Sequence, residues 1–270
     1  MLTILTPTYE RRHTLPRLYE SLCAQGRRDF EWLLVDDGST DGTEAWVEAL
    51  GTQAGFPIRI LRQENGGKHV ALNTGVQAAQ GEWVFIVDSD DWLTPDAIER
   101  VADALADAGR APQCVAGVCF RRAGPDGRLL GRPCAGPVPF VGTPSQVGRM
   151  VRGDLAYVFR RDIMASLPFP VIPGEKFVPE LYIWNRIGDR GQIRFYLDRA
   201  IYVCEYLDDG YTRNFRAHLR RSPGGFLLFY AAQIGREPHW AGKIKAAIRS
   251  LQCLAYCAAK AAADRGRPPA

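Results

Sequence analysis

The sequence lacks the features that mark membrane-spanning or disulfide-stabilised proteins. Its apolar runs fall short of the roughly 18 residues that a membrane-spanning helix requires. It has 7 cysteines, an odd number, and no two of them form a Cys-x-x-Cys pair. This distribution is typical of reduced thiols in a cytosolic protein. No basic segment followed by a long apolar core stands at the amino terminus, so we expect no signal peptide and a cytoplasmic location.

An excess of one charge is also missing. Lys and Arg number 34 against 30 Asp and Glu, which leaves a net charge of +4 on 270 residues. Without a dense basic stripe, a zinc finger or an RNA-recognition signature, we expect no nucleic-acid partner.

Two common nucleotide-binding motifs are also missing. No Gly-x-Gly-x-x-Gly motif is present, which disfavours a dinucleotide-binding fold of the dehydrogenase type. The segment Asn65–His69 is not a Walker A loop, because it lacks the first glycine and the hydroxyl residue of that motif.

Apolar runs alternate with helical patterns through residues 1–110. The expected strands are 2–6, 31–35, 57–62 and 83–87, and the expected helices are 13–25, 41–50, 68–79 and 94–108. Such alternation predicts an α/β fold with a sheet between helices. In residues 111–210 the pattern loosens, with strands near 114–121, 153–160, 193–197 and 200–205. Residues 211–270 are predicted to form a helical extension, with helices within 212–262.

Two acidic clusters follow two of the predicted strands. Asp36–Asp37 comes directly after Trp32–Val35, and Asp88–Asp91 comes after Trp83–Val87. Carboxylates that gather at the carboxyl ends of buried strands repel one another unless a cation or a ligand neutralises them. That edge is also where open α/β sheets bind ligands. Asp-rich turns and helix caps are the alternative for each cluster alone. Two such clusters, each at the end of a predicted buried strand, favour a ligand site.

The two clusters suit different contacts. Alternate residues of an extended segment point the same way, so Asp88 and Asp90 can share one hard cation, Mg²⁺ or Mn²⁺. In the other cluster we expect one of Asp36 and Asp37 to contact the ligand and the other to support its loop. Lys68 begins a predicted helix after two glycines, where it can bind a diphosphate or remain a solvated lysine.

Together these segments resemble family 2 glycosyltransferases of the GT-A fold, a Rossmann-like fold of nucleotide-diphospho-sugar transferases. The matching segments are Thr6–Tyr9, Val35–Thr43, Asn65–Gly67 with Ala71–Gly75, and Gly81–Asp91. The resemblance implies a mixed sheet flanked by helices, with a helical C-terminal appendage. It further implies a metal-dependent, inverting transfer of a hexose or N-acetylhexosamine from a nucleotide-sugar donor. A UDP-sugar is expected because family members use it frequently.

The resemblance also implies roles for individual residues. The implied nucleotide-binding residues are Thr6, Pro7, Thr8, Tyr9, Asp36, Asp37, Gly67, Lys68, Asn73, Asp88 and Ser89. The implied metal ligands are Asp88 and Asp90, and His218 is a weaker candidate that a helix-surface histidine would also explain. The family's Ala-Arg-Asn is Ala71–Asn73 here, without the arginine, so Lys68 is expected to supply that phosphate contact. Asp91, Trp92 and Trp184 are weak acceptor-binding candidates, and Trp184 alternatively belongs to the core.

The general base is expected at the start of a later helix. Family members carry a Glu-Asp-like pair there, and this chain has Pro179 and Glu180 at the two positions. Glu180 is therefore the predicted base for the acceptor hydroxyl, with Glu175 as the next candidate. A glutamate that merely begins a helix is the alternative for Glu180.

Two other functions remain open at this point. A nucleotidyltransferase also uses paired aspartates and a metal, although its basic glycine-rich loop after the first strand is absent here. A sugar-nucleotide-binding protein that has lost catalysis is the second alternative, because the base motif departs from the family pattern. For a transferase, the expected acceptor is a glycan or lipid-linked glycan in bacterial surface polysaccharide assembly.

The C-terminal extension carries an amphipathic pattern. Ile244, Ile248, Leu251 and Leu254 recur at helical spacing, and the nearby charges are Lys243, Lys245, Arg249 and Lys260. A helix that packs on its own domain is the simpler interpretation. Contact with a membrane surface or with a second copy is the alternative, and the former would place the protein at the inner face of the membrane.

Overall fold

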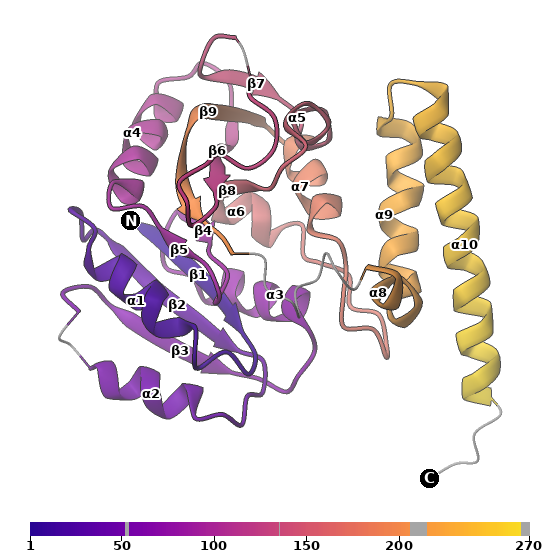
Figure 1. Cartoon of the computed structure of the whole chain (residues 1–270), viewed down its shortest axis with the longest axis horizontal. Coiled ribbons are helices and arrows are strands. Elements are labelled where there is room, and N and C mark those ends of the chain that lie inside the picture. Colours follow the sequence, from indigo (N-terminus) through magenta and orange to yellow (C-terminus); the bar gives the residue numbers. More distant parts are fainter. Residues whose placement is uncertain (52–53, 135, 206–214, 266–270) are drawn as a thin grey trace. The chain divides into compact units, whose positions relative to one another are not determined.

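The computed structural model describes residues 1–51, 54–134, 136–205 and 215–265 (Figure 1). The chain divides into two compact units. The first consists of Met1–Pro168 and Trp184–Glu205, and the second of Phe169–Ile183 and Tyr206–Ala270. In the described part of the chain, no helix is both long enough and apolar enough to cross a membrane.

The first unit is built on a mixed sheet, as predicted. Its strands follow the order β3-β2-β1-β4-β8-β6-β9-β5, and β7 pairs with β9. The strands are β1 (Leu2–Thr8), β2 (Phe30–Asp36), β3 (Ile58–Arg62), β4 (Trp83–Ile86), β5 (Trp92–Leu93), β6 (Val115–Ala123), β7 (Phe140–Gly142), β8 (Leu155–Arg160) and β9 (Gln192–Val203). Predicted strands 193–197 and 200–205 are thus parts of one long strand, β9.

The central strands are covered on both faces. Every residue of β1 and β2 is buried, which explains why apolar and β-branched residues predominate in both strands. The helices that accompany the sheet are α1 (Leu15–Cys23), α2 (Thr43–Leu50), α3 (Lys68–Ala78), α4 (Ala97–Gly109), α5 (Pro144–Val151) and α6 (Arg161–Ala165) (Figure 1). This arrangement confirms the predicted α/β class.

Parallel pairing brings the predicted site segments to one edge. β1 pairs in parallel with β2 and β4, so their carboxyl ends meet there. Thr8, the last residue of β1, is the direct partner of Asp36, the last residue of β2. One residue, Val87, separates Asp88 from the end of β4. The Val87 backbone N–H donates a hydrogen bond to the Leu5 carbonyl oxygen of β1, which keeps this segment beside β1. The two acidic clusters therefore lie at the same edge of the sheet.

The second unit is mainly helical. Its helices include α8 (Phe215–Arg221), α9 (Pro223–Arg236) and α10 (Trp240–Arg265), while α7 (Glu180–Gly188) begins in this unit and ends in the first. Residues 212–214 of the predicted helical segment lie outside the described residues. The small core joins Leu219, Phe226 and Cys253, with Phe177 packed against it. The segment 169–183 therefore contacts this core through Phe177.

A glycine next to the edge of β1 provides a test of this packing. A Cβ atom at Gly81 would lie 2.6 Å from the backbone nitrogen of Thr3, whereas a Cβ at Gly109 would meet nothing within 4 Å. We expect Gly81→Ala to lower the free energy of unfolding by about 1–3 kcal/mol, because neighbouring backbone must move. Gly109→Ala is the control and should leave stability unchanged or slightly higher. Thermal unfolding of both variants checks this, and equal melting temperatures would contradict the close approach at Gly81.

Candidate functional site

Two buried oxygens at the ends of β1 and β2 form no hydrogen bond with any described residue. They are Thr8 Oγ1 and Asp36 Oδ2. The other carboxylate oxygen of Asp36 accepts a hydrogen bond from the Ser39 backbone N–H at 2.9 Å. A buried polar atom without a partner costs about 1–3 kcal/mol, so such atoms are rare unless a ligand or water completes them. Tyr9, next to Thr8, has half of its surface exposed. These atoms can receive polar groups of a ligand, with an aromatic ring beside them.

Asp37 has the supporting role that the sequence predicts for one of the two aspartates. Its carboxylate accepts hydrogen bonds from the Gly66 N–H at 2.9 Å, the Gly67 N–H at 2.7 Å and the Gln63 side chain at 2.7 Å. Gly67 has φ of 94°, a conformation that favours glycine. Asp37 therefore holds the glycine loop against β2, and α3 begins after it at Lys68.

Lys68 points toward the second acidic cluster. Its Nζ lies 2.6 Å from Asp88 Oδ1, and the guanidinium of Arg122 lies 3.9 Å from Asp88 Oδ2. Burial opposes ionisation of Asp88, but the charges of Lys68 and then Arg122 more than offset it and lower the pKa of this carboxyl below its usual value. Two cations thus hold Asp88 ionised in this structure.

Asp91 is bound into the protein rather than directed outward. Its Oδ2 accepts a hydrogen bond from the Tyr202 hydroxyl at 2.7 Å and lies 3.4 Å from Arg122. Burial, and then the charge of Asp88, raise the pKa of Asp91 to about 7. The Tyr202 oxygen also accepts the Asp88 backbone N–H at 2.9 Å. Tyr202 and Arg122 therefore fix the conformation of the acidic loop, although Asp91 was predicted as an acceptor-binding residue.

Arg122 and Tyr202 lie at this site although their positions in the sequence did not predict it. Arg122 lies at the end of β6, its guanidinium 4.0 Å from the centre of the Tyr202 ring on β9. One signal was available: Arg121 and Arg122 interrupt an otherwise apolar strand. A buried arginine needs a charged or carbonyl partner, so this pair indicates a polar contact inside the fold.

Asp90 is the carboxylate best placed to receive a metal. It is half-buried, and no hydrogen bond or ion pair joins its carboxylate to another residue in the described part of the chain. Burial and then the charge of Asp88 raise the pKa of Asp90. The described residues contain no group of three metal-binding side chains. One carboxylate suits Mg²⁺ or Mn²⁺ when ligand phosphates and water complete the shell. The residues present therefore fit a metal bound together with a diphosphate.

The loop that carries Asp90 is anchored by Arg17. Its guanidinium donates to the Asp90 backbone oxygen at 2.6 Å, pairs with Glu205 at 2.9 Å and stacks on Trp92 at 3.9 Å. Trp92, predicted to contact the acceptor, thus has one ring face against Arg17.

Other predicted site residues are buried or half-buried. Trp184 is buried, with its ring 4.8 Å from that of Phe159, which supports the core alternative. Thr6 accepts a hydrogen bond from the Trp32 indole at 3.0 Å and is fully buried. Ser89 is buried in the acidic loop, Pro7 lies within β1, and Asn73 lies on α3.

The predicted base, its alternative and the weak metal candidate belong to the second unit. Glu180 is the first residue of α7. Glu175 accepts hydrogen bonds from the Gly224 and Gly225 backbone N–H groups, at 2.8 and 2.9 Å, and so stabilises the start of α9. His218 lies on α8 with its ring 6.2 Å from that of Phe177, and burial lowers its pKa.

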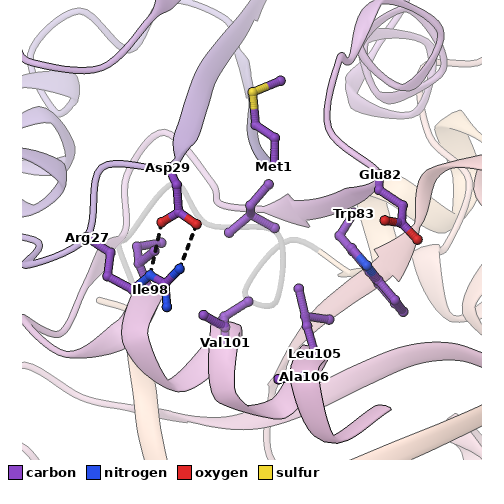
Figure 2. Close-up of a pocket in the computed structure, with 11 residues that line it drawn as sticks. Met1, Arg27, Asp29, Glu82, Trp83, Ile98, Val101, Leu105 and Ala106 are labelled. Atoms are coloured by element: carbon purple, nitrogen blue, oxygen red, sulfur yellow. Dashed lines mark hydrogen bonds and ion pairs between the residues drawn. The ribbon is translucent and has the colours of Figure 1, made fainter. Parts of the chain in front are cut away.

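A pocket of about 300 Å³ lies at the opposite edge of the sheet (Figure 2). Its lining includes Met1 and Trp83, which stand at the amino ends of β1 and β4. Figure 2 shows Arg27 and Asp29 paired beside it, at 3.0 and 2.8 Å. Because it lies away from the carboxyl ends of the strands, this pocket is distinct from the acidic clusters.

The first half of the chain is similar to a known family. Residues 3–132 match the family described as glycosyl transferase family 2. An uncharacterized glycosyltransferase of Escherichia coli strain K12, YibD, is 36% identical over 126 residues, which cover 46% of this chain and 36% of that protein. The match therefore spans little more than a third of that relative's length.

Two solved structures share the fold over nearly the whole chain. S. aureus TarS (residues 1–349), in complex with UDP-GlcNAc, superposes with a TM-score of 0.64 at 19% identity, covering 94% of this chain and 72% of that one. The mannosyltransferase PcManGT from Pyrobaculum calidifontis, in complex with GDP-Man and Mn²⁺, has a TM-score of 0.59 at 22% identity, covering 99% and 76%. Residues 3–132 therefore match glycosyl transferase family 2, and the mixed sheet with its flanking helices has the GT-A fold.

Proposed function

We propose that this protein is an inverting glycosyltransferase that moves a hexose or N-acetylhexosamine from a UDP-sugar to a hydroxyl acceptor. The main support is the pair of unpartnered buried oxygens of Thr8 and Asp36, at the sheet edge that also carries Asp90. Asp36 can accept an N–H of the base or a ribose hydroxyl, and Tyr9 can lie beside the base. Family membership makes a nucleotide-sugar the ligand to test first.

The diphosphate is proposed to lie between the glycine loop and the acidic loop. Lys68 begins α3, where a helix start and an ammonium group both favour phosphate. Asp90 would hold Mg²⁺ or Mn²⁺ against the diphosphate, and the metal would offset charge that develops on the leaving nucleotide. Because Asp88 is paired with Lys68, Asp90 is proposed as the main metal ligand and Asp88 as a charge partner of the phosphate-binding lysine. PcManGT, which has the same fold, was solved with both GDP-Man and Mn²⁺.

The acceptor is proposed to be activated by Glu180. A carboxylate that takes the hydroxyl proton while the oxygen attacks the anomeric carbon gives inversion in one displacement. This route requires no Ser or Cys nucleophile. A glycan or lipid-linked glycan of bacterial surface polysaccharide assembly remains the proposed acceptor class.

Donor binding measured by calorimetry tests the proposal. We expect UDP to bind in the presence of Mn²⁺ and more weakly without it, and GDP to bind more weakly than UDP. Asp36→Asn should weaken UDP binding about tenfold to a hundredfold, because a hydrogen bond to a charged buried group is lost. Asp90→Ala should remove the metal dependence.

Asp29→Asn is the matched control, because Asp29 lies at the opposite edge of the sheet and should leave UDP binding unchanged. Failure of both nucleotides to bind under any condition would contradict the donor site. Product analysis separates the alternatives: free nucleoside diphosphate supports sugar transfer, and pyrophosphate supports nucleotidyl transfer. Donor binding without turnover over a wide acceptor panel would favour a protein that has lost catalysis.

A further inference from the structure

Helix α10 of the second unit presents large apolar side chains to solvent. Its inward face buries Ala246, Ser250 and Cys253, and Cys253 joins the small core. The exposed fractions on the other face are 78% for Trp240, 57% for Ile244, 60% for Ile248, 66% for Leu251 and 49% for Leu254. A surface helix of a globular protein normally places polar residues on that face. α10 therefore has an apolar face that the described fold does not cover.

The apolar face is continuous rather than scattered. Trp240, Ile244, Ile248, Leu251 and Leu254 are three or four residues apart, so they form one stripe about 21 Å long. The remaining exposed positions of 241–262 are one lysine and six alanines: Lys245, Ala241, Ala255, Ala258, Ala259, Ala261 and Ala262. Contiguous exposed apolar surface of this kind marks an interaction site more often than chance exposure does.

The charged residues within the helix on the borders of this stripe are lysines, and a nearby carboxylate is that of Glu237, which lies 2.5 Å from where a Cβ of Gly242 would stand. Residues 238–262 contain Lys243, Lys245, Arg249 and Lys260, and no Asp or Glu. Lys243 and Lys245 lie on either side of the stripe by helical geometry, and the Lys243 ammonium is 5.3 Å from the centre of the Trp240 ring. The neighbouring helix α9 also contains no acidic residue (Figure 1).

We propose that this face of α10 lies on the surface of an anionic lipid bilayer. An apolar face with a tryptophan at one end and lysines along its borders suits the boundary between headgroups and acyl chains. The lysines then lie near anionic headgroups, and each lysine adds electrostatic attraction to the bilayer surface. A second copy of the chain fits less well, because two such faces would bring lysines together without an acidic partner. The proposal is independent of the donor site and of the reaction.

Vesicle flotation with the full-length protein tests the proposal. We expect the protein to float with vesicles of phosphatidylcholine mixed with phosphatidylglycerol, to bind phosphatidylcholine vesicles much more weakly, and to lose binding as salt is raised. The double substitution Ile248→Asp and Leu251→Asp should weaken binding at least about tenfold, because two inserted side chains become charged. Val171→Asp is the matched control: Val171 is 64% exposed, lies in the same unit outside α10, and should leave binding unchanged.

A second variant separates insertion from charge attraction. Lys243→Glu with Lys245→Glu keeps the apolar stripe and should reduce binding to anionic vesicles while leaving weak binding to phosphatidylcholine vesicles intact. The melting temperature of each variant should stay close to that of the wild type, because Lys245, Ile248 and Leu251 are exposed and Lys243 is half-buried beside the exposed Trp240 ring. Two results would overturn the proposal: wild-type protein that does not float with anionic vesicles, or a dimer in sedimentation velocity that the Ile248 and Leu251 substitutions dissociate while vesicle binding stays unchanged.

Discussion

Replacing Glu180 by Gln is expected to lower turnover by about 10²- to 10⁴-fold while UDP affinity stays nearly unchanged. The substitution keeps the size and hydrogen-bonding shape of the side chain but removes its ability to take a proton. The proposed donor-binding residues Thr8, Asp36 and Asp90 lie at the sheet edge in the first unit. A base that acts only on the acceptor should therefore affect kcat and not the calorimetric affinity for UDP.

The experiment compares Glu180→Gln with Glu175→Gln, using release of nucleoside diphosphate with the best acceptor from a panel. Glu175 accepts two backbone hydrogen bonds at the start of α9, so its substitution should lower the melting temperature and leave kcat near the wild-type value while the protein is folded. Loss of turnover in Glu175→Gln with normal turnover in Glu180→Gln would reverse the assignment of the base.

The sequence predicts the first half of the fold well because its central strands are buried on both faces. β1, β2 and β4 appear as short apolar runs, and each observed strand lies within about two residues of its prediction. The later strands were harder to delimit. β9 shifts register against β6 at Phe120 and Arg121, so two predicted strands belong to one irregular strand. Residues 169–183 belong to the helical unit, where Phe177 packs against the small core of Leu219, Phe226 and Cys253. No local sequence pattern predicts this contact.

The site was predictable where its residues follow a strand directly, and not where they come from distant strands. Asp36 and Asp88 stand just after apolar runs, so their place at the sheet edge follows from parallel pairing. Arg122 on β6 and Tyr202 on β9 both contact Asp91. Arg122 is 31 residues from Asp91 in the sequence, and Tyr202 is 111 residues from it. Such contacts depend on the order and register of strands, which a single sequence does not reveal.

Substitution of Arg122 by Met is expected to destabilise the first unit by about 3 kcal/mol, because it leaves the buried carboxylate of Asp91 without its cation and removes one of the two cations beside Asp88. The Arg122 and Asp91 side chains are 15% and 6% exposed and lie 3.4 Å apart. Arg122 also donates to the Leu155 backbone oxygen at 3.1 Å, which connects the cluster to β8. The predicted loss corresponds to a fall in melting temperature of roughly 6–12 °C. UDP binding should fall as well, because Asp90 belongs to the same loop.

Thermal unfolding and UDP calorimetry of Arg122→Met, Arg122→Lys and Arg160→Met check this prediction together. Arg160 pairs with Asp162 at 2.7 Å on the surface, where that aspartate is 61% exposed, so its loss should cost at most about 1 kcal/mol. Arg122→Lys should be intermediate, because an ammonium keeps the charge near Asp88 and Asp91 but loses the planar group that stacks on Tyr202 and reaches Leu155. If Arg122→Met and Arg160→Met unfold at the same temperature, the acidic loop does not depend on Arg122, and the order of Asp90 must come from Arg17 and the backbone alone.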